Sequence, residues 1–165
     1  MSNVVDLPRL LVETLPEAEV SAAADLLHKV WHSTYKADLP ASLRRERTPE
    51  HFLDYLQTRR TQTSIARLGG RMVGLASISA NCIEDLWVVK RYRRRGIGTA
   101  LVNHCLAQLR HVGFDHAQAG CEGFNRDAVQ FFQSLDWTCI GASTEQLTPA
   151  LHIEALVFSR PLAAA

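Results

Sequence analysis

The sequence has few of the residues from which disulfide frameworks and metal sites are built. It contains four cysteines, Cys82, Cys105, Cys121 and Cys139, and no two of them form a CxxC pair. Such spacing favours reduced thiols in a cytoplasmic protein over a disulfide framework or a zinc site. Because the cysteines and histidines do not gather into a set of ligands, we expect no bound metal.

Long apolar runs and a net excess of charge are also missing. No stretch approaches the roughly 18 apolar residues of a membrane span, and the N-terminus lacks the basic start and apolar core of a signal peptide. The formal net charge is only +1, whereas nucleic-acid-binding domains usually carry a basic excess. We therefore expect neither a membrane nor a nucleic acid as partner. The 165 residues suit one domain, residues 1–165, with a substantial core.

The periodicity of apolar residues predicts an α/β domain. The hairpin turn at Gly69-Gly70 requires antiparallel strands, whereas the later strand–helix–strand unit favours a parallel pair, so the sheet should be mixed. Gly113 should close the helix that precedes it. The predicted strands are 9–15, 64–68, 71–79, 83–89, 116–121, 137–142 and 152–158, and the predicted helices are 17–35, one beginning at Thr48-Pro49-Glu50, 98–112, and one from 125 or 126 to 135.

The segment KRYRRRGIGTALV, residues 90–102, has five cationic residues in its first six positions and then two glycines. It lies where a predicted strand ends and a helix begins. Free backbone N–H groups and the helix dipole make such a junction a phosphate site. Gly96 and Gly98 would let a phosphate approach the backbone, and arginines bind phosphate by forked hydrogen bonds. The alternative is a solvated surface run of charge. We favour a compact pyrophosphate as the ligand.

Two familiar phosphate loops do not fit this segment. The Rossmann fingerprint needs a third glycine, but position 101 is Leu. The P-loop needs a lysine before its Ser or Thr, whereas Thr99 follows Gly98 directly.

The segment IEDLWVVKRYRRRGIGTALVNHCL resembles the acyl-CoA-binding motif of the GCN5-related N-acetyltransferases. The family pattern, Gln/Arg-x-x-Gly-x-Gly/Ala after a strand, is matched by Arg93, Gly96 and Gly98. Downstream, NRDAVQFFQSLDW is similar to their second motif. There Asn125, Ala128 and Phe131 match, and Trp137 replaces the final aromatic residue. The order of predicted elements also agrees, so the resemblance covers nearly the whole chain.

The resemblance implies a single-domain fold with a mixed central sheet, helices on both faces, and a V-shaped split between two parallel strands that holds an acyl-CoA. The backbone of the strand before the turn would pair with the pantetheine arm, the turn would hold the pyrophosphate, and an asparagine would contact the cofactor further along. The cofactor-binding residues implied are Leu86, Trp87, Val88, Arg93, Arg94, Arg95, Gly96, Ile97, Gly98, Thr99 and Asn125.

Acetyl transfer to an amine needs a base, because an ammonium group cannot attack a thioester. Glu84 is our candidate, since the resemblance places it on the strand that holds the thioester. Strand alternation puts Glu84 and Asp85 on opposite faces, so one of the two should face the cleft. Asp85 and Glu122 are the alternatives. A backbone N–H near Val88 would hold the oxyanion, as the family implies.

The sequence departs from the family at Phe132, where many members place a tyrosine that protonates the departing thiolate. Phenylalanine cannot donate a proton. Tyr35, Tyr92 or Cys121 are possible substitutes, although no motif places them. We expect acceptor recognition in the first helix and the following loop, with His32 and Tyr35 as substrate-binding residues; packing is the alternative role for Tyr35.

The sequence thus predicts a cytoplasmic enzyme that moves acetyl from acetyl-CoA to a primary amine of a small molecule or peptide. The alternative, motivated by Phe132, is a non-catalytic acyl-CoA-binding regulatory module. The sequence leaves open which amine is the acceptor and whether the protein forms a homodimer.

Overall fold

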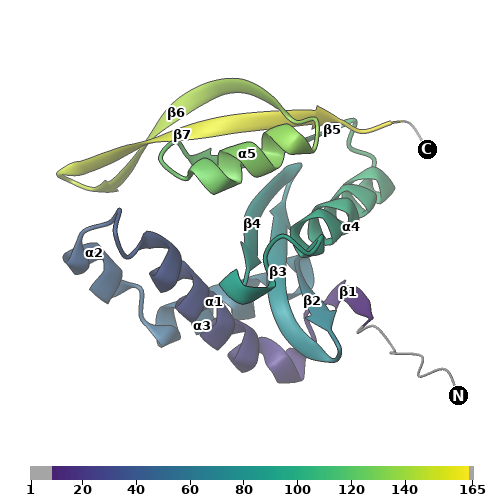
Figure 1. Ribbon diagram of the computed structural model, residues 1–165, viewed down its shortest axis with the longest axis horizontal. Helices are drawn as coiled ribbons and strands as arrows, with labels where there is room; N and C mark the ends of the chain where they lie inside the picture. The colour runs from purple at the N-terminus through teal and green to yellow at the C-terminus, as the bar shows by residue number, and fades with distance from the viewer. Residues whose placement is uncertain (1–8, 164–165) are drawn as a thin grey trace, which may run out of the picture.

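The computed structural model describes residues 9–163, and within them seven strands form one mixed sheet. The strand order is β1-β2-β3-β4-β5-β7-β6 (Figure 1). Adjacent strands are antiparallel except for the parallel pair β4–β5. The strands are β1 (Leu10–Thr14), β2 (Thr63–Leu68), β3 (Arg71–Ser79), β4 (Cys82–Val88), β5 (His116–Glu122), β6 (Thr138–Thr148) and β7 (Leu151–Pro161). The predicted mixed α/β sheet is confirmed.

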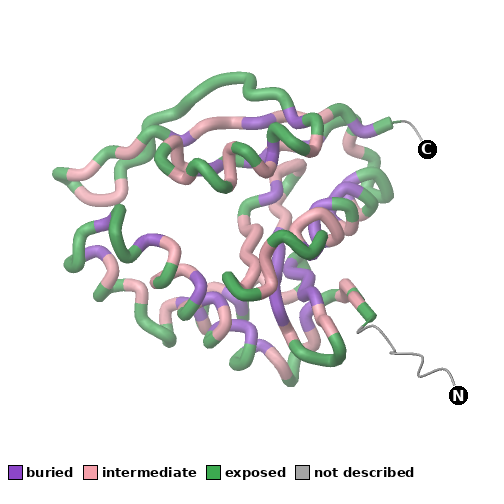
Figure 2. The backbone as a smooth tube through the Cα atoms, viewed as in Figure 1, coloured by how far each residue is buried: buried purple, intermediate pink, exposed green. Residues whose placement is uncertain are grey.

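Helices cover both faces of the sheet, as expected. On one face α1 and α3 pack on Ile65 and Leu75 of β2 and β3. On the other, α4 and α5 enclose a core that includes Leu101, Phe132 and Phe158. Figure 2 shows the buried residues along the central strands and the inward sides of these helices. The helices are α1 (Val20–Tyr35), α2 (Ala41–Glu46), α3 (Pro49–Arg59), α4 (Ile97–Val112) and α5 (Arg126–Ser134).

The helix ends follow the local signals in the sequence. Thr48 caps α3, its hydroxyl accepting a hydrogen bond from the backbone N–H of His51. Gly113 ends α4 in the left-handed conformation, with its N–H donating to the carbonyls of Leu109 and Arg110. The short helix α2 was not predicted. Its six residues contribute one buried side chain, Leu43, which is too little for an apolar period to be visible.

The strands β6 and β7 are longer than the predicted ranges 137–142 and 152–158. Almost every residue of β6 is exposed, so the strand carries little of the apolar alternation on which the prediction depended. The β6–β7 hairpin extends towards α2 (Figure 1). Near its turn, Leu147 and Leu151 pack against a small core formed by Tyr35, Leu39 and Leu43. The hairpin therefore reaches across from the end of the sheet to the segment that follows α1.

The parallel strands β4 and β5 separate soon after they pair. Their register runs through Cys82↔Gln118 and Ile83↔Ala119. Beyond this point β4 continues to Val88 and β5 to Glu122, while β4 keeps its pairing with β3 as far as Gly74↔Val88. The later residues of β4 thus keep a strand on one side and open onto a space on the other. This is the predicted V-shaped split.

Gly113 and Gly141 both leave room for a side chain but differ in backbone conformation, so together they test the role of Gly113 at the end of α4. An added Cβ would meet no atom within 4 Å at Gly113 or at Gly141, but Gly113 has φ +102°. Gly113→Ala should lower the free energy of unfolding by about 1 kcal/mol, because an L-residue in the left-handed region is strained. Urea unfolding measures this loss. Gly141→Ala should have no destabilising effect, and equal stability of the two variants would contradict the assignment.

Candidate functional site

A cavity of about 850 Å³ fills the split between β4 and β5 and continues along the start of α4 and one side of α5. Of the predicted cofactor-binding residues, all except Arg95 line it: Leu86, Trp87, Val88, Arg93, Arg94, Gly96, Ile97, Gly98, Thr99 and Asn125. Thr34 and Lys90 line the cavity too. Lys90 begins the cationic segment 90–102, whereas no motif marks Thr34, which adjoins Tyr35 on the last turn of α1. The fold thus gathers segments far apart in sequence around one space.

The turn before α4 presents free backbone donors to this cavity. Gly96 is the N-cap residue of α4, has φ +77°, and makes no side-chain cap. The N–H groups of the first helical residues, Ile97, Gly98 and Thr99, therefore have no intrahelical partner, and the helix dipole adds partial positive charge there. Arg94 also has a positive φ, 62°, which is uncommon for a residue with a side chain. The turn is thus built in the geometry that binds phosphate.

Gly98 has a packing role that the sequence did not predict. Its added Cβ would lie 3.1 Å from Cε2 of Phe131, so the missing side chain lets α5 pack closely on α4. At Gly96 an added Cβ would meet nothing within 4 Å, and the positive φ is what favours glycine. The two glycines of the motif are thus required for separate reasons, one for packing and one for backbone conformation.

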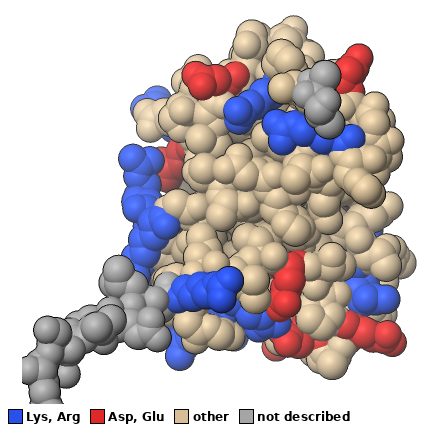
Figure 3. Space-filling model, turned by 90° about the vertical axis from the view of Figure 1, so that its right-hand side faces the viewer, with Lys and Arg blue, Asp and Glu red and all other residues tan. Residues whose placement is uncertain are grey.

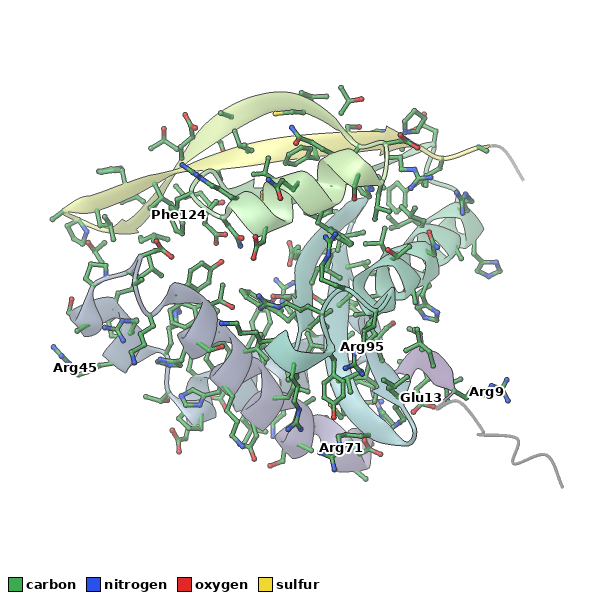
Figure 4. The ribbon with its side chains drawn as sticks, viewed as in Figure 1. Arg9, Glu13, Arg45, Arg71, Arg95 and Phe124 are labelled. Atoms are coloured by element: carbon green, nitrogen blue, oxygen red, sulfur yellow. The ribbon has the colours of Figure 1, made fainter. Side chains whose placement is uncertain are left out.

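The arginines of the turn point to different places. Arg93 donates through Nε to the carbonyl of Val88, at 3.0 Å, and through a terminal nitrogen to the hydroxyl of Thr34, at 3.4 Å. It thus joins the end of β4 to α1. Arg95 lies with its guanidinium 5.7 Å from the ring centre of Tyr92 and is not one of the cavity-lining residues in the described chain. The prediction that it contacts the cofactor therefore finds no geometric support. Figure 4 labels Arg95 at this turn.

Asn125 lines the cavity and also caps α5. Its side-chain oxygen accepts a hydrogen bond from the N–H of Ala128, at 3.2 Å. The capping contact fixes the side chain, and the amide nitrogen is the group left to contact a ligand in the cavity. A smaller cavity of about 330 Å³ adjoins this position and is lined by residues from the ends of α1, the turn after β4 and the start of α5, including Asp38, Lys90 and Asp127.

Glu84 lines the cavity and sits at an irregularity of β4. The register with β3 shifts between Ser77↔Asp85 and Ile78↔Ile83, which leaves Glu84 as the extra residue of a bulge. A bulge explains why Ile83 and Leu86, three residues apart, both join the core beneath α4. Simple alternation does not describe this part of the strand. The carboxylate of Glu84 forms an ion pair with Arg59 at the end of α3.

Asp85 is held on the other side of β4. It accepts hydrogen bonds from the hydroxyl of Tyr55, at 2.5 Å, from the hydroxyl of Ser77, and from the indole N–H of Trp87, at 3.2 Å. Burial, followed by the charge of Asp85, raises the pKa of Tyr55 above its usual range. Asp85 does not belong to the cavity-lining residues in the described chain. With three donors around it, it has a structural role and is a poor candidate for a base.

Tyr35 of α1 and Glu122 of β5 both line the cavity. Burial first, and then the carboxylate of Glu122, raise the pKa of Tyr35 above its usual range. The ring of Tyr35 packs edge-on against Trp31, Trp87 and Phe124; Figure 4 labels Phe124, in the loop after β5. Tyr35 is therefore a fixed wall of the cavity that presents a hydroxyl group.

His32, the other predicted substrate-binding residue, is turned away from the cavity. Its Nε2 lies 2.7 Å from the carbonyl oxygen of Arg47, and it is not a lining residue in the described chain. The contact ties α1 to the segment before α3. His32 also stands one turn from His28, with ring centres 4.4 Å apart. Within residues 9–163, no group of three potential ligands could hold a metal ion.

Phe132 is buried in the core, although it also borders the cavity. Its ring stacks on Phe158 with ring centres 5.4 Å apart and meets Trp137 edge-on. Trp137, which replaces the final aromatic residue of the second motif, thus packs in this core. The neighbouring Cys121 lines the cavity, and burial raises the pKa of its thiol to about 11. A thiol with this pKa stays protonated near neutral pH.

Charge on the surface is dispersed. On the face in Figure 3, Lys and Arg occur in separate groups, with Asp and Glu between or beside them. In the described part of the chain, the helices are too short or too polar to cross a bilayer. The largest local concentration of positive charge in the sequence stays at residues 90–95, at the turn that borders the cavity.

Comparison with known proteins agrees with this architecture. A model of the acetyltransferase (GNAT) family matches residues 25–137. No curated protein matches the chain significantly.

Many solved structures share the fold at low sequence identity. A GCN5-related N-acetyltransferase from Rhodopseudomonas palustris aligns with a TM-score of 0.74 at 18% identity, over 98% of this chain and 100% of its own. The protein yncA from Salmonella typhimurium, in a structure with its cofactor acetyl-CoA, gives a TM-score of 0.72 at 15% identity, over 95% of this chain and 96% of its own. The ribosomal-protein-S18-alanine N-acetyltransferase of Escherichia coli gives 0.68 at 15% identity, over 95% and 96%.

The hydrogen bonds to Asp85 allow a test of its structural role. Asp85→Ala should lower the free energy of unfolding by about 2–3 kcal/mol, because it leaves three partly buried donors without their acceptor. Asp85→Asn keeps one acceptor oxygen and should lose less. Urea unfolding without ligand gives both values. Asp54→Ala, at an exposed position of α3, is the matched control; an Asp85→Ala protein as stable as this control would refute the role.

Proposed function

Because the chain belongs to the acetyltransferase (GNAT) family, we propose that it transfers an acetyl group from acetyl-CoA to a primary amine of a small molecule or peptide, by direct attack in a ternary complex. The observation that carries this proposal is the cavity in the split between β4 and β5, which leads to the free N-terminus of α4. Acetyl-CoA is an extended molecule with a thioester at one end and a pyrophosphate towards the other, and this shape suits the cavity.

We assign the cofactor to the residues around that split. The backbone of Leu86, Trp87 and Val88 would pair with the pantetheine arm, since this stretch of β4 has no partner strand on the β5 side in the described register. The N–H groups of Ile97, Gly98 and Thr99 would bind the pyrophosphate, with Arg93 and Arg94 beside them. Asn125 would contact the arm through its amide nitrogen. The acetyl-CoA bound to yncA supports this assignment through the shared fold.

We propose Glu84 as the base that removes the first proton of the acceptor ammonium. Glu84 lines the cavity, and the bulge turns it out of the regular strand pattern. Its ion pair with Arg59 would hold the carboxylate in one place. Once the amine is neutral it attacks the thioester carbon, and a backbone N–H near Val88 would stabilise the oxyanion.

The alternative is an acyl-CoA-binding module without catalysis. It is favoured by the packing of Phe132 on Phe158, which leaves the usual position of the proton donor apolar. The two functions differ in one measurable respect, the consumption of thioester in the presence of amines. A panel of spermidine, a lysine-containing peptide and an alanine-initiated peptide, each with acetyl-CoA, separates them, because the module would bind acetyl-CoA and release no free thiol.

Cofactor binding can be separated from folding at Arg94. Acetyl-CoA should raise the melting temperature by mass action. Arg94→Gly relieves the positive φ of 62° and removes one guanidinium, so the unliganded protein should be at least as stable as the wild type, while the affinity for acetyl-CoA falls about 10-fold. Thermal shift and isothermal titration calorimetry measure the two effects.

Arg91 provides the control for this experiment, since its guanidinium lies over Tyr92 and it does not line the cavity in the described chain. Arg91→Ala should bind acetyl-CoA as the wild type does. An Arg94→Gly protein with undiminished affinity would contradict the proposed pyrophosphate site. Gly98→Val is less informative, because its side chain would first collide with Phe131.

Glu84→Gln tests the proposed base. The substitution keeps the size of the side chain and should lower kcat roughly 10²-fold, with the affinity for acetyl-CoA unchanged. The deficit should shrink at high pH, where more of the acceptor is already neutral. Release of free CoA thiol with the amine panel is the measurement. Glu17→Gln, at an exposed position before α1, is the control, and full activity of Glu84→Gln would remove this residue as the base.

A further inference from the structure

The hydroxyl groups of the three tyrosines lie in different surroundings. All three tyrosines fall within the described residues 9–163. Tyr55 donates its hydroxyl proton to Asp85. Tyr92 packs between two arginines, with the guanidinium carbons of Arg91 and Arg95 at 5.0 Å and 5.7 Å from its ring centre. Tyr35 is the tyrosine that lines both the large cavity and the smaller one beside it.

The ring of Tyr35 is fixed on every side. It is the last residue of α1 and is only 3% exposed. Its ring centre lies 5.1 Å from that of Trp31, 5.8 Å from that of Trp87 and 6.2 Å from that of Phe124, all in edge-on contacts. The leucines near the β6–β7 turn pack on the same small core. A hydroxyl carried on a ring held in this way has one position, which a proton donor in a reaction requires.

Glu122 lies beside this hydroxyl on β5, and the two side chains line the same cavity. Burial and then the carboxylate of Glu122 raise the pKa of Tyr35, so the hydroxyl keeps its proton while Glu122 is charged. If Glu122 gains a proton, this repulsion disappears and Tyr35 becomes a stronger acid. The other titratable or charged groups that face Tyr35 or line the cavities with it are Cys121, Glu145, Glu84, Asp38, Lys90, Arg93, Arg94, Arg126 and Asp127.

We propose that Glu122 and Tyr35 form a proton relay that carries the second proton of the acceptor nitrogen to the sulfur of CoA. The relay rests on the proposed acetyl transfer and adds to it the proton donor that Phe132 cannot supply. Glu84 and Glu122 then act on different protons: Glu84 on the one lost before attack, Glu122 on the one lost afterwards.

The steps balance as follows. The acceptor ammonium gives one proton to Glu84, and its nitrogen then forms a bond to the thioester carbon and becomes positively charged. As the carbon–sulfur bond breaks, the nitrogen loses its second proton to Glu122. The hydroxyl of Tyr35 gives its proton to the departing sulfur and recovers one from Glu122. The products are the amide and the CoA thiol, while the proton on Glu84 passes to solvent.

Cys121 is another group beside Tyr35 that could carry a proton, but it is less suited to the relay. Burial raises the pKa of its thiol to about 11, and a thiol donates a weaker hydrogen bond than a phenol does. Tyr92 is excluded by its place outside the cavity lining in the described chain. Tyr35 is therefore the tyrosine whose hydroxyl the fold brings to the split.

The experiment compares Tyr35→Phe, Glu122→Gln and the double variant, with acetyl-CoA and the amines of the panel. Each single variant should lower kcat about 10²-fold, with the calorimetric affinity for CoA unchanged. The double variant should lose no more than the worse single variant, because the two groups act as one unit. Tyr92→Phe, the same loss of a hydroxyl outside the cavity, is the control and should keep the wild-type kcat.

A pH profile separates proton transfer from a merely structural role. In Glu122→Gln the loss of negative charge lowers the pKa of Tyr35, so the basic limb of kcat should appear at lower pH than in the wild type. The limb should be absent when Tyr35→Phe is added. Ultraviolet titration of the tyrosines in the unliganded protein should show the same downward shift in Glu122→Gln.

Three results would overturn the relay. An unchanged kcat in Tyr35→Phe, while Glu84→Gln is impaired, would leave acetyl transfer standing and remove the relay. Multiplicative losses in the double variant would show that the two residues act independently. Absence of wild-type turnover with every amine, together with acetyl-CoA binding, would overturn the relay and the proposed enzyme alike.

Discussion

The separation of β4 from β5 is the constraint on which the rest of this structure depends. Two residues of each strand pair in register, and the later residues of β4 are left with a partner on one side only. Unpaired backbone donors and acceptors inside a protein are costly, so the open edge needs a ligand or water. The fold thus leaves room beside β4 for one more extended segment, and α4 and α5 border this space.

The packing around the split keeps it open. Phe131 of α5 fits against Gly98 at the start of α4, which brings the two helices together at the mouth of the cavity. On the other side of β4, Asp85 collects three hydrogen bonds from Ser77, Tyr55 and Trp87. The bonds from Ser77 and Tyr55 connect β4 to β3 and α3 on the side away from the gap. The bulge at Glu84 lies between Ile83, which pairs with β5, and Asp85, which holds these hydrogen bonds.

Much of this arrangement could be predicted from the sequence, because local signals determine it. Gly113 and the Gly69-Gly70 turn act through their own backbone geometry, and Thr48 acts through its side-chain cap on α3. The arginine-glycine turn lies where strand and helix meet. What could not be predicted depends on distant partners. The role of Gly98 is set by Phe131, thirty-three residues later, and the bulge is a property of the register with β3. His32 and Arg95 lie outside the cavity lining in the described chain for the same reason, since each is directed by a contact that no motif contains.

In the proposed reaction, the two glutamates that line the cavity have different tasks. Glu84 forms an ion pair with Arg59 at the end of α3. Glu122 stands beside the neutral, buried hydroxyl of Tyr35, which can exchange a proton with it but brings no positive charge. Amine acetylation releases two protons at different moments, one before the new bond forms and one after. A carboxylate fixed by a cation suits the first event, whereas a carboxylate coupled to a hydroxyl suits the second, because the proton that it gains can be handed on to the departing sulfur.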